Sequence, residues 1–257
     1  MSNIVVKKQI KRFFETGKVK ELTDELINEC RLSIRLDGED FVRAMVSPSL
    51  LEEFVLGFLL TRGLIQRAED VSSIEITDNL ALVIRNEQAK TSLPSATLLE
   101  STGNRNVDLA QDFRVYKKID GTGFRVPAKV IINCVRMLSK MPVFNRTGGT
   151  HCAILFSPAG ESLFQAEDLG RHNTVDKVIG GGLKKGIDLS DCWLAVSGRL
   201  PSDMVFKAAM VGIPLIASVS AVTSDGVKTG ERAGMTVVGF VRDKRLNCYC
   251  HPERVVV

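Results

Sequence analysis

Two polar, glycine-bearing stretches dominate the second half of this chain. The first runs Phe144-Asn145-Arg146-Thr147-Gly148-Gly149-Thr150-His151. The second runs Glu167-Asp168-Leu169-Gly170-Arg171-His172-Asn173-Thr174-Val175-Asp176-Lys177. The segment between them predicts a strand hairpin, and the apolar spacing of Val175, Val178 and Ile179 predicts a helix within and after the second stretch.

Polar residues this dense between buried elements cost stability unless they meet a ligand or one another. Gly170 lets the backbone turn sharply, so the helix that follows would present free N–H groups beside Arg171 and His172. Such a helix start suits an anion, for example a phosphate.

A purely structural alternative fits the same spacing. Asp168 or Asn173 would then cap the helix, and Arg171 would pair with Glu167. Local spacing does not decide between a ligand site and a hydrogen-bonded helix start.

The composition is that of an ordinary globular protein. Of 257 residues, 44% are hydrophobic and 25% charged, which allows one large or two modest domains. The net charge of +4 permits an anionic ligand but does not resemble that of a general nucleic-acid binder. No apolar run approaches a membrane span, and residues 1–16 lack a secretory apolar region, so we expect a cytoplasmic protein.

The first half predicts a small α+β domain over residues 1–125. Residues 1–28 are polar and predict an arm with little core. Alternating residues predict hairpins around Asp37-Gly38 and around Asp78-Asn79. Between them, Ser49 and Glu52 predict a capping box for a helix that ends at Gly63. Residues 86–125 lose periodicity and predict a loop or linker.

The second half, residues 126–257, predicts a second domain of α/β class. Pro127 suits the first turn of a helix, and the helix at 173–179 would end at Gly180-Gly181-Gly182. Strands at 193–196, 213–219 and 235–241 then alternate with helices at 202–210 and 224–233. This alternation predicts a mostly parallel sheet covered on both faces.

Sheets of this kind bind ligands at the loops that follow the carboxyl ends of their strands. Three such loops are polar: Ser197-Gly198-Arg199, Ser218 to Thr223, and Phe240-Val241-Arg242-Asp243-Lys244-Arg245. Taken singly, the first loop fits a surface turn, the second a helix cap and the third a solvated basic turn. Taken together with Arg171 and His172, they predict one cationic pocket for a phosphorylated ligand, with an aromatic ring or a guanidinium to stack on a base.

The string Thr147 to His151, followed by Glu167 to Gly180, resembles the formate dehydrogenase accessory protein family FdhD, and Leu51 to Gly63 is similar to a helix of that family. The resemblance implies a sulfurtransferase acting on the molybdenum cofactor. It implies that the segment 240–245 binds Mo-bis(molybdopterin guanine dinucleotide), which also suggests a GDP-like ligand. It further implies a cytidine deaminase-like αβα sandwich, a cysteine desulfurase and formate dehydrogenase as partners, and a homodimer. The zinc signature of deaminases, His-x-Glu with Pro-Cys-x-x-Cys, does not occur in the chain.

The resemblance also implies a persulfide-carrying cysteine in a Cys-x-x-Cys between the two domains. The equivalent region here, Leu99 to Arg105, contains no cysteine, and the chain has no Cys-x-x-Cys. Cys134 lies on an apolar helical face. Cys152 adjoins His151, but neighbours on a strand point to opposite faces.

One other group of thiols could act. Cys248 and Cys250 would share a strand face, followed by His251, and three soft ligands could hold a metal or a labile sulfur. Packing at the end of a strand is the alternative.

The sequence therefore predicts a formate dehydrogenase accessory protein that binds the molybdenum cofactor and supports its sulfuration, with enzymatic sulfur transfer left open and no metal site assigned. Phosphates would contact Arg171, His172, Arg199, Arg242, Lys244 and Arg245. A ligand could approach the backbone closely at Gly148, Gly149 and Gly170. Neighbouring groups would be oriented by His151 and Asp168. The rivals are a cofactor carrier without thiol chemistry and a nucleotide hydrolase that uses His151, Asp168 or His172 as acid or base.

Overall fold

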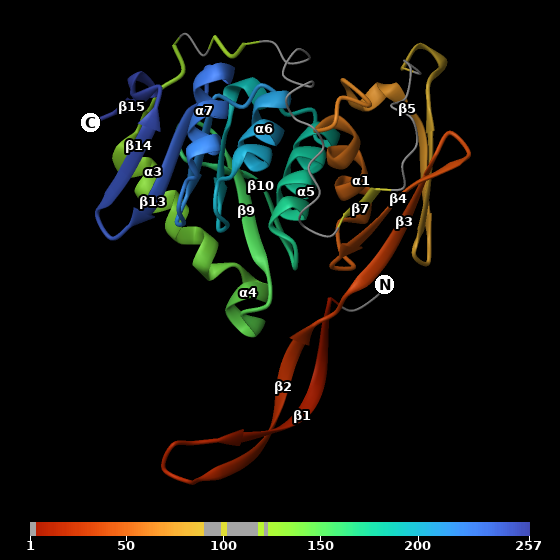
Figure 1. The fold of residues 1–257 in the computed structure, drawn as a ribbon, viewed down its shortest axis with the longest axis vertical. Helices are drawn as coiled ribbons and strands as arrows, with labels where there is room; N and C mark the ends of the chain where they lie inside the picture. Colours follow the sequence, from red (N-terminus) through yellow and green to blue (C-terminus); the bar gives the residue numbers. More distant parts are fainter. Residues whose placement is uncertain (1–3, 90–98, 102–117, 121–122) are drawn as a thin grey trace.

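A computed structural model describes residues 4–89, 99–101, 118–120 and 123–257 of the chain. These residues form a projecting arm, a five-stranded sheet with one helix, and a six-stranded sheet with helices on both faces (Figure 1). No helix in these ranges is both long and apolar enough to cross a membrane.

The five-stranded sheet has the order β5-β6-β3-β4-β7. Its strands are β3 (Cys30–Leu36), β4 (Glu39–Val46), β5 (Val71–Thr77), β6 (Leu80–Arg85) and β7 (Leu99–Ser101). Both predicted hairpins are confirmed, with Asp37 (φ 53°) and Gly38 (φ 94°) in the left-handed region that a tight hairpin turn requires. Most of the predicted linker at 86–125 lies outside the described residues.

Helix α1 (Leu51–Leu60) covers this sheet, but the predicted capping box is wrong. The helix begins after Leu50, which is left-handed (φ 51°), and no side chain caps it among the described residues. The chain turns here because the backbone N–H and hydroxyl of Ser47 are held by Asp168, both at 2.9 Å. Long-range bonding to the second half of the chain overrides the local cap.

The six-stranded sheet has the order β10-β9-β11-β12-β13-β14. Its strands are β9 (His151–Phe156), β10 (Ser162–Asp168), β11 (Trp193–Val196), β12 (Leu215–Ser218), β13 (Thr236–Arg242) and β14 (Arg245–Cys250). The prediction of a mostly parallel sheet is wrong, because only β11–β12 and β12–β13 pair in parallel. Short turns join β9 to β10 and β13 to β14, and a short turn permits only antiparallel pairing.

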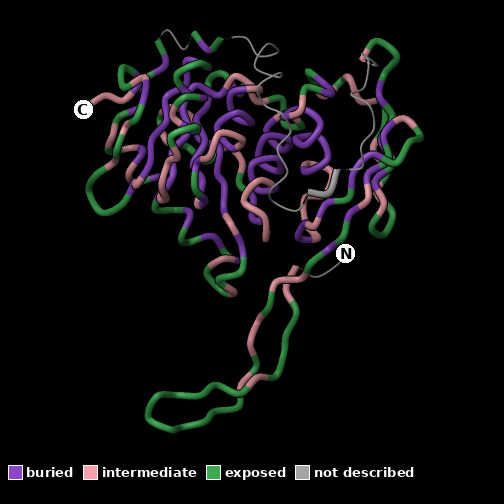
Figure 2. The backbone as a smooth tube through the Cα atoms, viewed as in Figure 1, coloured by how far each residue is buried: buried purple, intermediate pink, exposed green. Residues whose placement is uncertain are grey.

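Helices cover both faces of this sheet, which gives three layers (Figure 1). Helix α3 (Ala128–Val135) packs on Ile154 and Trp193 of one face. Helices α5 (Arg171–Lys184), α6 (Ser202–Met210) and α7 (Ser224–Ala233) pack on the face of Leu155 and Leu194. The buried residues form a continuous layer between them (Figure 2). This confirms a mixed α/β fold; a kinship with cytidine deaminases stays a prediction.

Helix α5 runs through Gly180, Gly181 and Gly182 to Lys184, so the predicted end of this helix is wrong. The glycines are required by packing. A Cβ on Gly180 would lie 1.9 Å from the carbonyl oxygen of Glu53, and a Cβ on Gly57 would lie 1.8 Å from that of Asp176. Helices α1 and α5 thus meet backbone to backbone, and one core spans both sheets across the boundary proposed near residue 125.

The first residues form a hairpin, β1 (Val5–Phe13) with β2 (Val19–Ile27), that projects from the rest of the molecule (Figure 1). The sequence predicted an arm here but not its strands. The remaining short elements are β8 (Val126–Pro127), β15 (Val255–Val256), α4 (Pro142–Thr147), and the 3-10 turns η1 (Ala68–Asp70), η2 (Glu87–Ala89), η3 (Arg136–Lys140), η4 (Leu189–Asp191) and η5 (Pro252–Arg254).

Candidate functional site

The polar strand ends of the six-stranded sheet lie along a single edge. Strands β11, β12 and β13 are parallel, so their carboxyl ends lie together. Because β9 is antiparallel to β11 and β10 is antiparallel to β9, the start of β9 and the end of β10 lie at the same edge. We call this the strand-end edge; it carries His151, Asp168, Ser197, Ser218 and Arg242 together with the loops that continue from them.

Hydrogen bonds join the three loops of the strand-end edge. The hydroxyl of Ser218 donates to the carbonyl of Gly198 at 2.7 Å, which links the loops after β11 and β12. The N–H of Phe240 donates to the carbonyl of Ser220 at 2.9 Å, which links the loops after β12 and β13. The predicted capping role in the middle loop is also confirmed, because Thr223 accepts from Gly226 at the start of α7.

His151, Ser197 and Arg171 meet at the centre of this edge. His151 Nδ1 lies 3.2 Å from Ser197 Oγ, which also accepts from the N–H of Cys152 at 2.9 Å. The stem of Arg171 covers Gly198, where a Cβ would lie 3.0 Å from that of Arg171. Burial, followed by the charges of Arg171 and His172, lowers the pKa of His151. His151 is therefore kept neutral, which suits hydrogen bonding rather than charge pairing.

The start of α5 opens onto the same edge. Its first turn follows Gly170, and no side chain among the described residues caps it. The Nε atom of Arg171 is buried and has no hydrogen-bond partner in the described part of the chain. Backbone N–H groups and a guanidinium N–H are thus left beside one another, as an anion site requires.

His172 is held by a residue that the sequence analysis missed. Its Nε2 atom lies 2.7 Å from Oδ2 of Asp203, in the first turn of α6. Burial acts to raise the pKa of Asp203, but the hydrogen bond and charge of His172 lower it overall. No sequence signal links these two residues, because their contact depends on how α6 packs against α5.

Asp168 is a structural residue. Its carboxylate accepts from the N–H of Gly170 and from Nδ2 of Asn173, both at 2.8 Å, and lies 2.6 Å from Nζ of Lys177. Together with the two bonds from Ser47, these contacts occupy both carboxylate oxygens. Asp168 orients the start of α5, as expected, and offers no free oxygen for acid–base work.

Glu167 does not pair with Arg171, contrary to the structural alternative. Neighbours on β10 point to opposite faces, so Glu167 faces α4 and accepts from the N–H groups of Val143 at 3.0 Å and Phe144 at 2.5 Å. The first quoted stretch is therefore partly the helix α4, which ends at Gly148 (φ 64°). Gly148 and Gly149 are exposed, and Gly149 packs against Ile27 of the arm rather than lining the centre of the edge.

The cationic loop after β13 lies further along the edge. It is the turn of the β13–β14 hairpin, and β12 separates it from Ser197 by two strand spacings, roughly 10 Å. Arg242 lies 4.9 Å from the ring centre of Phe240, which is left-handed (φ 49°), while Val241 is buried in the core. Besides Gly148 and Gly149, the exposed members of the predicted site are Arg199, Arg242, Asp243, Lys244 and Arg245.

None of the six cysteines is prepared as a thiolate. Burial, followed by Glu167, raises the pKa of Cys152 to about 12. Burial also raises the pKa of Cys192 and of Cys250 to about 11. It likewise raises the pKa of the other three thiols, those of Cys30, Cys134 and Cys248. A nucleophilic thiol requires the opposite shift.

The predicted common face of Cys248 and Cys250 is wrong. A register shift pairs Val238 with Cys248 but Val237 with Cys250, so Cys250 joins the core under α7 and Cys248 packs on the opposite face. His251 instead contacts Glu253 at 3.0 Å. No cluster of three or more His, Cys, Asp or Glu residues that could hold a metal occurs in the described ranges.

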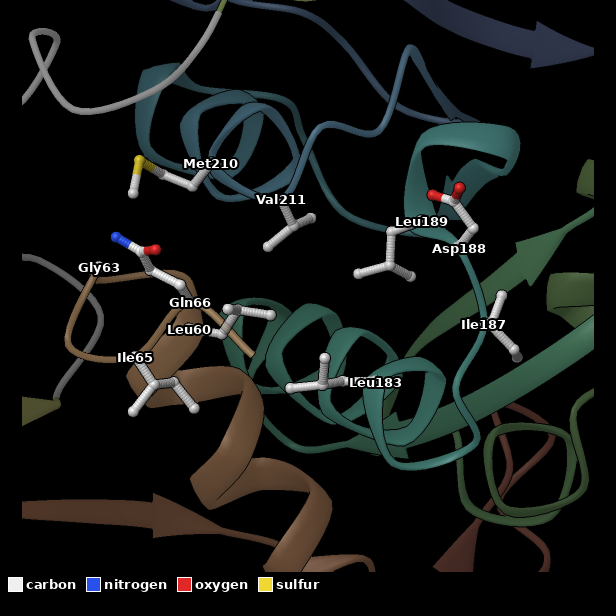
Figure 3. A pocket seen from close by; sticks show the side chains of 10 residues that line it. All are labelled: Leu60, Gly63, Ile65, Gln66, Leu183, Ile187, Asp188, Leu189, Met210 and Val211. Carbon is white, nitrogen blue, oxygen red and sulfur yellow. The ribbon is translucent and has the colours of Figure 1, made fainter. Parts of the chain in front are cut away.

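A separate cavity of about 470 Å³ lies where α1, α5 and α6 end, remote from the start of α5 (Figure 3). The side chains of Leu60, Leu183 and Leu189 line it (Figure 3). Asp188 is engaged in a turn, where it accepts from the N–H of Ser190 at 2.9 Å. Most of the lining side chains are apolar, with Gln66 and Asp188 as the polar exceptions, and none of them is a cation. This cavity therefore does not suit a phosphorylated ligand.

The fold and the strand-end edge define a mixed α/β protein with cationic groups gathered at the strand ends of its larger sheet. The model of the FdhD/NarQ family matches residues 27–256, and the chain belongs to this family.

Relatives support this membership over nearly the whole chain. The chain is 35% identical over 250 residues to the "Sulfur carrier protein FdhD" of Methanothermobacter thermautotrophicus, covering 97% of this chain and 98% of the relative. It is 36% identical over 256 residues to the protein of the same name from Sulfurisphaera tokodaii, covering 97% and 99%. A crystal structure from Desulfotalea psychrophila, assigned as a formate dehydrogenase accessory protein, has a TM-score of 0.83, 26% identity, and coverage of 99% and 100%.

Proposed function

We propose that this chain is an accessory protein of formate dehydrogenase that binds the guanine dinucleotide part of Mo-bis(molybdopterin guanine dinucleotide) at the strand-end edge. One observation supports the proposal most strongly. The uncapped start of α5, with the unpartnered Nε of Arg171, lies at the same edge of the sheet as the loops after β11, β12 and β13. The names of the relatives support the accessory role. The cofactor is the cargo of such a protein, not a resident group.

Different residues of the strand-end edge would bind different parts of the ligand. The N–H groups at the start of α5 and the guanidinium of Arg171 would hold a phosphate. The neutral His151 with Ser197 would offer hydrogen bonds to a sugar or base. About 10 Å further along, Arg242 over Phe240 offers a flat, charged surface on which guanine can stack. The spacing suits an extended nucleotide rather than a lone phosphate.

Calorimetry with GDP tests this arrangement, because GDP carries the guanine and phosphate groups without the metal. We expect Arg242→Ala with Arg245→Ala to weaken GDP binding by about tenfold, in line with the loss of a charged hydrogen bond. The matched control is Lys129→Ala with Lys228→Ala, which removes the same charge from exposed positions elsewhere. Equal affinity in both double variants would place the nucleotide site away from the β13–β14 turn.

The relatives' common name favours a second candidate function, the carriage of sulfur from a cysteine desulfurase to the cofactor. Direct carriage needs a thiol, and all six thiols have a raised pKa; Cys248 is the least buried of them. Incubation with a cysteine desulfurase and labelled cysteine, followed by mass spectrometry, tests for a persulfide. Label on Cys248 would support direct sulfur transfer. Unlabelled thiols would leave a carrier that holds the cofactor without covalent chemistry.

A further inference from the structure

The β1–β2 hairpin is a two-stranded ribbon attached to the body at its base. Arg146 of α4 contacts both carboxylate oxygens of Glu25 at 2.7 Å, and the methyl of Ile27 packs on Gly149. Beyond this base the strands pair only with each other among the described residues, and nearly all of their length is exposed (Figure 2). An isolated two-stranded hairpin is marginally stable in water, so a partner that covers it would stabilise it.

The ribbon carries an unusual share of exposed apolar side chains. At its tip Phe13 is 74% exposed, Phe14 42% and Val19 50%; nearer the base Val6 is 42% and Leu26 44% exposed. These five are half of the ten large apolar residues that are exposed in the described part of the chain. Apolar residues gathered on one projecting element indicate a protein interaction surface.

The charge of the ribbon determines what kind of partner fits. Nearer the base, Lys7, Lys8 and Lys11 lie opposite the carboxylates of Glu25, Asp24 and Glu21. The tip carries Arg12, Lys18 and Lys20 against the single carboxylate of Glu15, so cations are in excess there. Lys11 pairs with Glu21 at 3.3 Å, but Arg12 lies directly opposite Lys20 in the register. Like charges opposite each other destabilise a ribbon unless an anionic group lies against them. Two ribbon tips of the same sign would repel each other, whereas an acidic surface would attract a tip.

The base of the ribbon lies beside the strand-end edge. Ile27 contacts Gly149, which precedes Thr150 and His151 at the start of β9. The ribbon and α4 therefore lie at the same end of the sheet (Figure 1). A protein that held the ribbon would face the loops proposed to hold the cofactor.

We infer that the β1–β2 ribbon is the docking element for the client enzyme, formate dehydrogenase, and that it binds an acidic surface with an apolar recess on that enzyme. This inference rests on the proposed accessory function. The cations attract and orient the acidic surface, Phe13 and Val19 insert into the recess, and the attachment at Glu25 and Ile27 holds the client opposite the strand-end edge.

The test uses the full chain and purified catalytic subunit of formate dehydrogenase made without its cofactor. Biolayer interferometry measures Kd for the wild type and for two ribbon variants, Arg12→Glu with Lys20→Glu and Phe13→Ser with Val19→Ser. Each variant should raise Kd at least tenfold, and added salt should weaken wild-type binding. Two control variants, Lys129→Glu with Lys228→Glu and Leu82→Ser with Ile84→Ser, make the same kinds of change at exposed residues elsewhere and should leave Kd unchanged.

Calorimetry with GDP on the same variants separates this inference from the proposed function. GDP affinity should not change in the ribbon variants, and failure of GDP to bind any variant would remove the cofactor site while leaving the docking result standing. Wild-type Kd values in the ribbon variants would overturn the inference. The inference would also be overturned if light scattering showed that the wild type is a dimer and the ribbon variants are monomers. The same holds if the ribbon variants lost binding to a cysteine desulfurase but kept binding to formate dehydrogenase.

Discussion

Helix α5 has two regions that are built differently, although one continuous stretch of sequence supplies both. One region is the side that faces α1, and the other is the end that opens onto the strand-end edge. On the side, Lys177 pairs with the buried Asp168, and Lys207 with the buried Asp176. At the end, the first turn is uncapped and the Nε of Arg171 has no partner among the described residues. The paired buried charges hold the fold together. An unpartnered Nε alone does not indicate a ligand, since those of Arg62 and Arg254 also lack partners in the described part of the chain. At the end of α5 it lies beside uncapped backbone N–H groups, and that combination suits an anion.

The largest effect that this comparison predicts concerns Lys177. Lys177→Met leaves the buried carboxylate of Asp168 without its cation, and we expect a loss of about 3–5 kcal/mol in the free energy of unfolding. Urea unfolding followed by the fluorescence of Trp193, the single tryptophan, measures it. Lys228→Met, at an exposed ion pair, is the control and should change nothing measurable. A loss below about 1 kcal/mol for Lys177→Met would mean that the α1–α5 interface does not depend on this pair.

Gly180→Ala should have the next largest effect. Its Cβ would lie 1.9 Å from the carbonyl oxygen of Glu53, so α1 and α5 would have to separate, at a cost of about 1–3 kcal/mol. Gly182→Ala is the matched control, because its Cβ would meet side-chain ends rather than backbone, those of Leu189 at 3.0 Å and Leu155 at 3.1 Å. Thermal denaturation compares the two variants. Equal melting temperatures would show that the backbone contact between the helices is not required.

The pH dependence of stability tests the second buried pair. Burial lowers the pKa of Lys207 to about 8, although the charge of Asp176 opposes the shift. Between pH 8 and 9 the unfolded chain holds this proton more tightly than the folded protein, so the contribution of Lys207 to stability rises with pH. The slope from one group is at most about 1.4 kcal/mol per pH unit. Urea unfolding at several pH values should show this rise in the wild type and a smaller one in Lys207→Met; parallel profiles would exclude the effect.

Local patterns were sufficient to predict much of the fold. The turns at Asp37-Gly38 and Asp78-Asn79, the strand β11 and the helices α6 and α7 were all recognised from spacing and turn residues. Two failures, the helix cap predicted at Ser49 and the predicted end of α5, share a cause, since each depends on a distant contact. Gly180 continues a helix because Glu53 lies against it. The antiparallel pairs of the larger sheet follow instead from short turns.

The candidate site divides in the same way. Strand ends and cations could be predicted to lie at one edge, because the ends of parallel strands follow from the order of strands and helices. The bond between Asp168 and Ser47 could not, since the two residues lie 121 positions apart in the chain. Nor could the contact of His172 with Asp203, or the register shift that turns Cys248 and Cys250 to opposite faces. Whether the edge binds a nucleotide stays a prediction.

A titration of the ¹⁵N-labelled protein with GDP, followed by the chemical shifts of backbone amides, tests that prediction most directly. If the start of α5 and the strand-end loops hold the nucleotide, the amides of Arg171, His172 and Gly198 will shift most, and those of Leu183 and Leu189 at the separate cavity will not. Shifts concentrated at Leu183 and Leu189, with Arg171 and Gly198 unmoved at saturation, would contradict the account.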